Sequence, residues 1–358
     1  ATMKRQLNAW GVCYDWDREV ISCLPEYYRW TQWLFLQLFE HGLAYKAKAP
    51  VNWCPSCLTV LANEQVIDDG HCERCSTLVE AKEMEQWFFR ITAYAQRLLD
   101  DLAKLGGWPE RVRTMQSNWI GRSEGTIVDF RLAPRVDGAP DREARVPCFT
   151  TRVDTIYGCT YLVLAPEHPE LKPLLRGLPE EAAVQAFIRE AGRKSFIDRT
   201  ADSTAKNGVF TGRYVINPYN GERIPLWVAD YVLMHYGTGA VMAVPAHDTR
   251  DWAFAKRYGL PIRIAIQNPE QTLDLATMAA AYTADGLTAN SGPFSHLPNR
   301  EAIRQMTAAA QAQGFGRAQV HFRLRDWLIS RQRYWGAPIP IVYCGTCGTV
   351  PLRAQDLP

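Results

Sequence analysis

Residues 236–258 decide how the rest of the chain is interpreted: Tyr-Gly-Thr-Gly-Ala-Val-Met-Ala-Val-Pro-Ala-His-Asp-Thr-Arg-Asp-Trp-Ala-Phe-Ala-Lys-Arg-Tyr. Gly237 and Gly239 free the backbone for a tight turn, and the apolar run 240–244 has the length of one buried strand. Pro245 ends that strand, and a helical pattern follows it. The stretch therefore predicts a strand, a turn and a helix in quick succession.

Two carboxylates stand at the start of this predicted helix. Asp248 and Asp251 are three residues apart and share one helix face, with His247 beside them. This arrangement suits a cationic or hydroxyl-rich ligand. It also suits a helix cap, because Asp is a favoured N-cap and an acid three residues later completes a capping box. The stretch alone leaves both interpretations open.

The chain has 358 residues, which predicts two or three compact units. Its 47% hydrophobic and 22% charged residues are typical of a soluble globular protein. A net charge of +2 gives no global field for nucleic acid, so any RNA contact is expected to be local. The sequence has no apolar run of membrane-spanning length and no signal-peptide pattern, so we predict a cytoplasmic protein without membrane contact. Both ends look cut rather than natural.

Six of the 10 cysteines form three Cys-x-x-Cys pairs. Cys54, Cys57, Cys72 and Cys75 give the spacing Cys-x2-Cys-x14-Cys-x2-Cys, which is typical of a zinc ribbon with four thiolates. Four sulfurs close a tetrahedral shell, so we predict a structural zinc site rather than a catalytic one. The third pair, 344/347, is consistent with half of a second zinc site, and the sequence leaves open whether it binds metal.

The order of patterns suggests separate parts along the chain. Helices are expected in the first 50 residues, the zinc ribbon over 51–80, and a long amphipathic helix over 83–105 followed by a hinge loop at 118–125. After the hinge loop, short apolar runs of strand length separated by turns continue to about residue 318, a pattern typical of an α+β or barrel-like domain. Its expected elements are strands at 126–132, 145–150, 159–165, 226–234 and 240–244, and helices near 179–191 and 300–313.

A second candidate stretch follows the strand predicted to end at residue 150. It reads Thr150-Thr-Arg-Val-Asp-Thr155, with three hydroxyls, a cation and an acid. Such residues also form ordinary turns at strand ends, so the stretch alone decides nothing. Further on, residues 323–335 are rich in Arg and Trp, a mixture that suits phosphate and base contacts but also a packed core with solvated arginines.

Several sequence blocks together resemble the leucyl-tRNA synthetase family, of bacterial type, nearly end to end. The blocks are Asn52-Trp-Cys-Pro55, Leu61-Ala-Asn-Glu-Gln-Val66, Asn118-Trp-Ile-Gly-Arg-Ser-Glu-Gly125, Thr150-Thr-Arg152, Gly237-Thr-Gly-Ala-Val-Met-Ala-Val-Pro-Ala-His-Asp248 and Ser330-Arg-Gln-Arg-Tyr-Trp-Gly-Ala-Pro-Ile-Pro340. The resemblance implies an α/β multidomain fold. It comprises parts of a class I Rossmann-like catalytic core, a zinc ribbon and an inserted α+β or barrel-like editing domain.

The resemblance also divides the chain. It implies core or connective helices over 1–50, the zinc-ribbon module over 51–80, a connective helix and hinge over 81–124, the editing domain over 125–318, and a return to the core over 319–358. The complete enzyme attaches leucine to tRNA(Leu) with ATP and Mg, and its editing domain hydrolyses mischarged norvalyl or isoleucyl esters. Editing is needed because a pocket rejects a missing or moved methyl by only about 1–3 kcal/mol.

Site residues carry over from the family one at a time. Thr150, Thr151 and Arg152 resemble the wall that meets the terminal adenosine and the ester carbonyl, and Thr155 resembles the gate that excludes leucine. Met242 and Val244 are expected to line the side-chain pocket, with His247 nearby. Asp251 resembles the carboxylate that pairs with the substrate's α-ammonium, supported by Asp248. No side chain is an obvious nucleophile, so a positioned water is expected.

The chain departs from the family at three points. Val153 replaces the usual proline, and the His-x-Gly-His and Lys-Met-Ser-Lys-Ser signatures of the ATP site are absent. We therefore expect this chain alone to be unable to activate leucine. The predicted partners are tRNA(Leu), and leucine and ATP for the complete enzyme, acting as a monomer. The alternative is a zinc-containing RNA-binding or free-standing trans-editing protein, which has no use for core sequence on both flanks.

Overall fold

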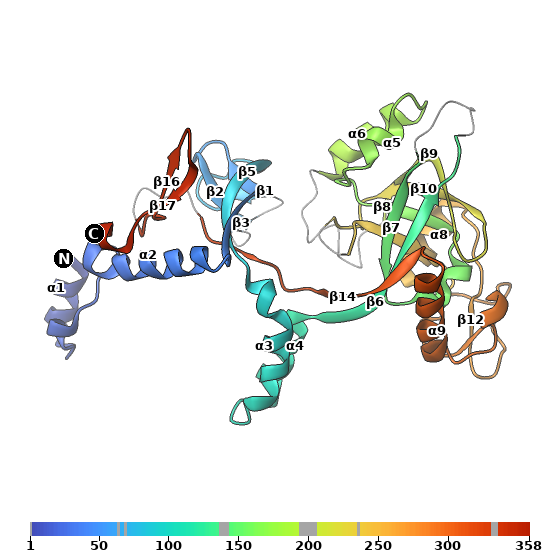
Figure 1. Cartoon of the computed structure of the whole chain (residues 1–358), viewed down its shortest axis with the longest axis horizontal. Helices are drawn as coiled ribbons and strands as arrows, with labels where there is room; N and C mark the ends of the chain where they lie inside the picture. The colour runs from blue at the N-terminus through green and yellow to red at the C-terminus, as the bar shows by residue number, and fades with distance from the viewer. Residues whose placement is uncertain are drawn as a thin grey trace. The chain divides into compact units, whose positions relative to one another are not determined.

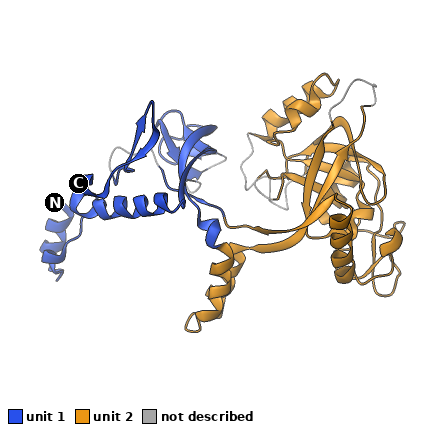
Figure 2. Cartoon of the chain, viewed as in Figure 1, with its two compact units in different colours: residues 1–94, 325–358 blue, residues 95–324 orange. Residues whose placement is uncertain are grey.

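The computed structural model describes residues 2–62, 65–67, 70–135, 143–192, 206–234, 237–330 and 336–358. The chain divides into two compact units (Figure 2). The first unit comprises residues 1–94 and 325–358, and the second comprises residues 95–324. The second unit is thus inserted into the sequence of the first. The block 331–335, which contributes to the resemblance, lies outside the described residues.

The first unit combines one small sheet, short hairpins and two helices (Figure 1). Its elements are α1 Thr2–Ala9, η1 Trp16–Arg18, α2 Pro25–Glu40, β1 Ala44–Cys54, β2 Thr59–Leu61, β3 Val66–Ile67, β4 His71–Cys72, β5 Glu80–Phe89, η3 Ile91–Tyr94, β15 Trp327–Leu328, β16 Ile341–Cys344, β17 Gly348–Pro351 and η7 Ala354–Asp356.

The sheet of the first unit has the strand order β15-β5-β1-β2. The helix predicted over 83–105 is wrong, because its first part is strand β5, which pairs antiparallel with β1 from Ala44↔Phe89 to Trp53↔Glu80. Only the later part of this range is helical as expected, as η3 Ile91–Tyr94, α3 Ala95–Asp101 and η4 Leu102–Lys104. The apolar side chains of β5 pack on α2, where the rings of Phe35 and Trp87 meet at 5.2 Å between centroids. This non-local pairing outweighs the local helical pattern.

Asp326, where the chain returns to the first unit, is hydrogen-bonded to residues of that unit's first segment. Its carboxylate accepts hydrogen bonds from the Tyr45 hydroxyl at 2.7 Å and from the Thr92 hydroxyl at 2.8 Å. The Thr92 backbone N–H donates to the same carboxylate at 3.1 Å. Since the first unit ends its first segment at residue 94 and resumes at 325, these bonds join its exit and return points.

The second unit is built on one large sheet. Its elements are α3 Ala95–Asp101, η4 Leu102–Lys104, α4 Glu110–Ile120, β6 Arg122–Leu132, β7 Arg145–Thr150, η5 Val153–Gly158, β8 Tyr161–Leu164, α5 Leu171–Leu175, α6 Glu181–Ala191, β9 Gly208–Ile216, β10 Arg223–Ala229, β11 Ala240–Ala243, α8 Thr249–Tyr258, β12 Ile266–Gln267, β13 Leu287–Thr288, η6 Gly292–Phe294, α9 Asn299–Ala312 and β14 Gly316–Phe322.

The large sheet curls back on itself. Its strand order is β11-β8-β10-β9-β6-β14, and β7 pairs with β6. At the other end of the sheet, β7 also contacts β11. There the Cys148 thiol donates to the Ala240 carbonyl at 3.4 Å and accepts the Met242 backbone N–H at 3.0 Å. This contact closes the sheet into the barrel-like domain that the sequence predicted.

The predicted elements of this unit are mostly present. Strands β6, β7, β8 and β11 and helices α6 and α9 lie where they were expected, whereas the strand expected at 226–234 is β10 and ends at Ala229. The loop expected at 118–125 is also wrong. Helix α4 continues to Ile120, Gly121 ends it in a left-handed conformation with φ 57°, and β6 starts at Arg122. Figure 1 shows β6 running directly from α4 into the sheet.

Candidate functional site

The stretch that contains β11 and α8 forms the strand, turn and helix that the sequence predicted. Gly237 and Gly239 have φ of 65° and 72°, which favours glycine. Asp248 is the N-cap of α8, since its carboxylate accepts the backbone N–H groups of Arg250 and Asp251 at 2.9 and 3.1 Å. The Arg250 guanidinium also pairs with this carboxylate at 3.2 Å. Asp248 is partly exposed and stabilises the first turn of α8 as its N-cap.

Asp251 does not complete a capping box. Its carboxylate turns inward and accepts the Val244 backbone N–H at 2.8 Å and the Tyr231 hydroxyl at 3.2 Å. The Tyr161 hydroxyl donates to the Asp251 backbone carbonyl at 3.2 Å. Asp251 is 2% exposed, so it ties the end of β11 to α8 from inside the domain. Each carboxylate oxygen accepts one of these bonds and keeps a second lone pair.

The charge of Asp251 differs from expectation. A position at a helix start favours an ionised carboxylate, yet burial raises the pKa of Asp251 to about 7, with a further contribution from the negative charge of Asp248. The helix dipole is too weak to offset this desolvation. Asp251 therefore changes charge near neutral pH, and a cation beside it would favour the ionised form.

The threonine-rich stretch forms a tight turn between β7 and η5. The Thr150 hydroxyl accepts the Arg152 backbone N–H at 3.0 Å, and the Thr155 hydroxyl donates to the Arg152 carbonyl at 2.7 Å. Thr151 is exposed, whereas Thr155 is 2% exposed. The turn therefore fixes Thr155 inside the domain and leaves Thr151 facing solvent.

Sequence reasoning missed Asp154, which orients the arginine of this turn. The Asp154 side chain is fully buried and accepts two-pronged hydrogen bonds from the Arg152 guanidinium at 3.0–3.2 Å. The Arg152 side chain is 28% exposed, so its cation is anchored at the surface of the domain. The available signal was the Arg-x-Asp spacing itself, since a buried carboxylate needs a partner.

The turn and the strand meet in one core. Met242 and Val244 are 5% and 4% exposed and belong to the same apolar cluster as Val153 and Ile156 of the turn. The backbone N–H of Thr160 donates to the Ala243 carbonyl at 3.2 Å, which links the end of the turn to β11. The structure thus brings the two predicted stretches together in one core. Val153, the departure from the family, is fully buried.

Both ring nitrogens of His247 contact backbone groups inside the domain. Its Nε2 accepts the backbone N–H groups of Ala265 and Ile266 at 2.8 and 3.0 Å, and its Nδ1 lies 3.0 Å from the Tyr282 carbonyl. Burial lowers the pKa of His247 to about 4, and the charge of Arg152 lowers it further. The imidazole is therefore neutral, with both nitrogens engaged. It holds the neighbouring segments and has no nitrogen left for a substrate or for a proton transfer.

The cysteines of this unit are equally unsuited to nucleophilic attack. Cys148 and Cys159 are fully buried, and burial raises the pKa of Cys148 to about 12 and that of Cys159 well above its usual value. Thiolates are the reactive species, so neither residue is activated. Neither these two thiols nor the imidazole of His247 is therefore available as an activated nucleophile or base.

Two hollows open elsewhere on the second unit, and neither includes the predicted site residues. The first has a volume of about 350 Å³ beside α8, and the second has a volume of about 580 Å³. The second is lined by Tyr157, Asn220, Glu222, Arg263, Ile264, Gln267, Leu273, Asp274, Leu275 and Asn290. Tyr157 lies in the same η5 turn that holds Thr155.

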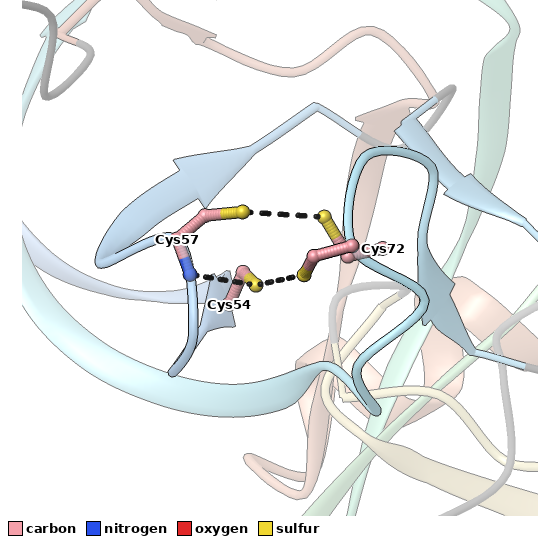
Figure 3. A group of neighbouring side chains, drawn as sticks. Cys54, Cys57 and Cys72 are labelled. Carbon is pink, nitrogen blue, oxygen red and sulfur yellow. Dashed lines mark hydrogen bonds between the residues drawn. The ribbon is translucent and has the colours of Figure 1, made fainter.

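The first unit gathers Cys54, Cys57, Cys72 and Cys75, whose sulfurs all lie within 4.8 Å of one another. Figure 3 labels the first three of them. The Cys54–Cys75 and Cys57–Cys72 sulfurs are 3.4 and 4.0 Å apart. A zinc ion with bonds of about 2.3 Å to four tetrahedral sulfurs needs about 3.8 Å between them. The donor set and spacing therefore fit zinc. Among the described residues, no other group of three or more potential ligands is found.

Comparisons with known proteins identify the class of enzyme. The first unit of this chain has a four-cysteine ribbon and a small sheet, and a barrel-like second unit is inserted into its sequence, as expected of a class I tRNA synthetase from the resemblance. The sequence model described as "tRNA synthetases class I (I, L, M and V)" matches residues 1–127. The model described as "Leucyl-tRNA synthetase, editing domain" matches residues 117–311, more than half of the chain. The chain belongs to the leucyl-tRNA synthetase family.

Individual relatives agree with this assignment. The chain is 57% identical to a leucine–tRNA ligase of Symbiobacterium thermophilum and 52% identical to one of Thermotoga maritima, covering all of this chain and 41% and 42% of those proteins. A solved LeuRS of Agrobacterium radiobacter K84, in a ternary complex with tRNA and LeuAMS, matches with a TM-score of 0.75 and 40% identity. That match covers 99% of this chain and 40% of the solved chain.

The comparisons confirm the predicted family and fold class. The chain spans about two-fifths of the length of the curated relatives it matches. A free-standing RNA-binding or trans-editing protein is not favoured, because class I synthetase sequence continues outside the editing domain. None of the helices in the described residues has the length and apolar character needed to cross a membrane.

Proposed function

We propose that this chain is part of a leucine–tRNA ligase and that its second unit hydrolyses the ester bond of mischarged tRNA(Leu). The observation that carries the proposal is the match of the editing-domain model to residues 117–311. That range contains both predicted stretches, which the fold joins through one core. The favoured substrates carry norvaline or isoleucine, which differ from leucine by a missing or moved methyl group.

The residues of the site would act mainly by positioning the substrate and a water molecule. The anchored guanidinium of Arg152 and the hydroxyl of Thr151 face solvent and would hold the terminal adenosine and the ester carbonyl. The buried carboxylate of Asp251 would receive the α-ammonium on its remaining lone pairs. Because no described thiol or imidazole of the site is available for attack, a water molecule held by substrate and turn would cleave the ester. Leucine would be excluded at Thr155.

Deacylation by the purified chain tests this proposal. Norvalyl-tRNA(Leu) and isoleucyl-tRNA(Leu) should lose their amino acid faster with the protein than in buffer, whereas leucyl-tRNA(Leu) should remain charged. Equal rates with and without a correctly folded protein would contradict the hydrolytic function. The measurement follows release of the labelled amino acid from tRNA.

The same proposal assigns a structural zinc ion to Cys54, Cys57, Cys72 and Cys75. Cys54 and Cys72 are fully buried, and Cys75 lies 3.3 Å from the Thr77 hydroxyl. Hydrogen bonds from Thr77 lower the pKa of Cys75 to about 6, whereas the hydrogen bond with Cys75 and burial raise the pKa of Cys57 to about 12, so Cys75 is the first of these two thiols to become a thiolate. Four protein ligands would leave no open position, so the ion would stabilise the ribbon and take no part in catalysis.

Removing this zinc is expected to unfold the ribbon locally. Metal analysis of the native protein should find one zinc per chain, tightly bound by these four cysteines. Cys54→Ser should lose this zinc, because only three thiolates remain and the buried serine hydroxyl cannot replace the fourth. Cys148→Ser, at a buried cysteine of the other unit, is the matched control and should keep the zinc. A Cys54→Ser protein with unchanged zinc would contradict the assignment.

The hydrolysis rate should depend on the charge of Asp251. Binding of the α-ammonium needs the carboxylate, and the pKa of Asp251 is raised to about 7, so kcat/KM should rise as the pH increases through about 7. Tyr231→Phe removes a hydrogen bond to the carboxylate, which raises the pKa of Asp251 further. Its pH–rate profile should therefore shift to higher pH.

A second tyrosine provides the control for this shift. The Tyr219 hydroxyl donates to the Met306 carbonyl at 2.8 Å, a similar bond that does not involve Asp251. Tyr219→Phe should lose comparable stability and keep the wild-type profile. If both variants, or neither, move the midpoint of kcat/KM against pH, Asp251 is not the group that titrates.

The complete enzyme would carry out leucine activation with ATP and Mg and transfer to tRNA(Leu), as the family assignment supports. The complex of the solved relative contains tRNA. The sequence of this chain has neither His-x-Gly-His nor Lys-Met-Ser-Lys-Ser. Aminoacylation assays with this chain alone should therefore give no leucyl-tRNA. Its monomeric state and cytoplasmic location stay predictions.

A further inference from the structure

Three arginines form a row on the outer face of the large sheet in the second unit. Arg131 of β6 lies opposite Arg145 of β7 on one side and opposite Ile216 of β9 on the other. Ile216 in turn lies opposite Arg223 of β10. Residues that pair directly across strands point to the same face of a sheet, and all three arginines are exposed. The next residue of each strand faces the core instead: Leu132, Val146 and Ile224.

The row has no carboxylate partner among the residues that the structure describes, since none of its three arginines forms an ion pair there. Glu222, next to Arg223, pairs with Arg263 instead. Asp129 lies two residues before Arg131 on the same face of β6 and makes no ion pair with it. Like charges directly opposite one another destabilise a sheet, and the first two arginines of the row are placed in this way. An anion bound across the row would remove this repulsion.

Neutral groups hold one end of the row in place. The guanidinium carbon of Arg223 lies 4.3 Å from the centre of the Tyr214 ring, and its Nη2 donates to the Pro134 carbonyl at 3.4 Å. The Tyr214 ring packs edge-on against Phe210, with 5.4 Å between centroids. Neither partner of the guanidinium neutralises it, so its charge stays available to a ligand. Arginine beside an aromatic ring suits a surface that binds a nucleic-acid strand.

The row shares strand β7 with the proposed site. This strand runs from Arg145 in the row to Thr150, which starts the turn that holds Arg152. Five residues of strand span about 17 Å, a distance that a few phosphates of an RNA strand can cover. Because the net charge of the chain is only +2, the positive potential of the row is local. The row is therefore placed to guide one segment of a polyanion towards the turn.

We propose that the row of Arg131, Arg145 and Arg223 binds the phosphate backbone near the 3′ end of tRNA while the terminal ester lies at the turn over residues 150–155. The inference rests on the proposed function, which makes mischarged tRNA(Leu) the substrate. A planar guanidinium binds phosphate oxygens through two hydrogen bonds, and such contacts position a nucleic acid without reading its sequence. The row therefore contributes to substrate binding and leaves the cleavage step to the turn.

Binding of labelled, uncharged tRNA(Leu) to the full chain, measured by fluorescence anisotropy over a range of salt concentrations, tests the row. Each phosphate contact contributes about 0.7–0.9 to the steepness with which log K falls against log salt concentration. Arg131→Gln/Arg145→Gln should therefore make this slope shallower by about 1.4–1.8. The same relation predicts binding weakened roughly 25- to 60-fold at about 0.1 M salt, with the loss fading towards 1 M salt.

The chain supplies a matched control. Arg111→Gln/Arg189→Gln removes the same charge from exposed arginines of α4 and α6, outside the row, and should keep the wild-type slope. Thermal unfolding gives an independent readout, because Arg131→Gln/Arg145→Gln removes two facing like charges. Its unfolding temperature should equal or exceed that of the wild type. A lower unfolding temperature would mean that the two arginines stabilise the sheet, which contradicts the proposal.

Deacylation kinetics separate this inference from the proposed function. With norvalyl-tRNA(Leu), Arg131→Gln/Arg145→Gln should raise KM and keep kcat. Absence of hydrolysis by the wild type would contradict the proposed function, whereas the binding measurement would still decide the role of the row. The row is excluded as a tRNA-binding surface if this variant keeps the wild-type slope or if the control variant loses as much. It is also excluded if polyglutamate of equal charge displaces labelled tRNA as well as unlabelled tRNA does.

Discussion

Replacement of Asp251 by alanine is expected to lower kcat/KM for hydrolysis of norvalyl-tRNA(Leu) by roughly 30-fold to several thousand-fold. Loss of one partner of a buried, hydrogen-bonded charge pair costs about 2–5 kcal/mol, and each 1.4 kcal/mol is about tenfold in rate. Asp251 is 2% exposed, so no solvent would replace its charge beside the α-ammonium. Deacylation kinetics at a pH above the pKa of Asp251 measure this loss.

The structure requires controls for stability, because Asp251 also accepts bonds from Val244 and Tyr231. Asp251→Asn keeps the size of the side chain and removes the charge, so it should lose nearly as much activity as alanine while unfolding at a higher temperature than the alanine variant. Asp248→Ala removes the N-cap and should cost about 1 kcal/mol of stability with most of the activity kept. An active, folded Asp251→Asn protein would exclude the ammonium-binding role.

Replacement of Thr155 by alanine is expected to let the second unit hydrolyse leucyl-tRNA(Leu). Thr155 is buried, and its hydroxyl bonds to the Arg152 carbonyl of its own turn. Alanine removes a methyl and a hydroxyl group and would open space for the branched side chain of leucine. A pocket that gains such space changes discrimination by about 1–3 kcal/mol, so hydrolysis should rise roughly 10- to 200-fold above the wild-type level.

Two further variants separate bulk from hydrogen bonding. Thr155→Val keeps the bulk and loses the hydroxyl bond, and it should still spare leucyl-tRNA(Leu). Thr155→Ser keeps the hydroxyl and loses the methyl, and it should hydrolyse leucyl-tRNA(Leu) to an intermediate extent. If valine opened the site as alanine does, the turn's hydrogen bond rather than side-chain bulk would exclude leucine.

Local sequence signals predicted the parts of the fold that depend on local chemistry. Pro25 begins α2, Asp248 caps α8, and short apolar runs became β7, β8 and β11. The ribbon spacing predicted four sulfurs that the fold gathers in one place. Each of these features is determined by a few neighbouring residues, so a short window of sequence contains the information.

The errors arose where distant residues decide the outcome. Residues 80–89 form a strand because β1 lies beside them, and no local pattern reveals that partner. The pairing of Asp154 with Arg152 was visible as a spacing but not as a buried ion pair. The sequence left open whether Asp251 caps its helix or binds a ligand. The folded chain turns its carboxylate inward to Val244 and Tyr231, and burial raises its pKa, which a short stretch of sequence does not reveal.

The bonds between Asp326 and Thr92 have a consequence for folding. They hold the two ends of the interrupted first unit together, so the host needs only a short bridge to close over the site of interruption. An inserted segment that leaves and re-enters the host at adjoining points adds little loop-closure entropy, because this cost rises only slowly with the length of the insertion. Deletion of residues 95–324, with a few glycines joining the two ends, should therefore leave the first unit able to fold.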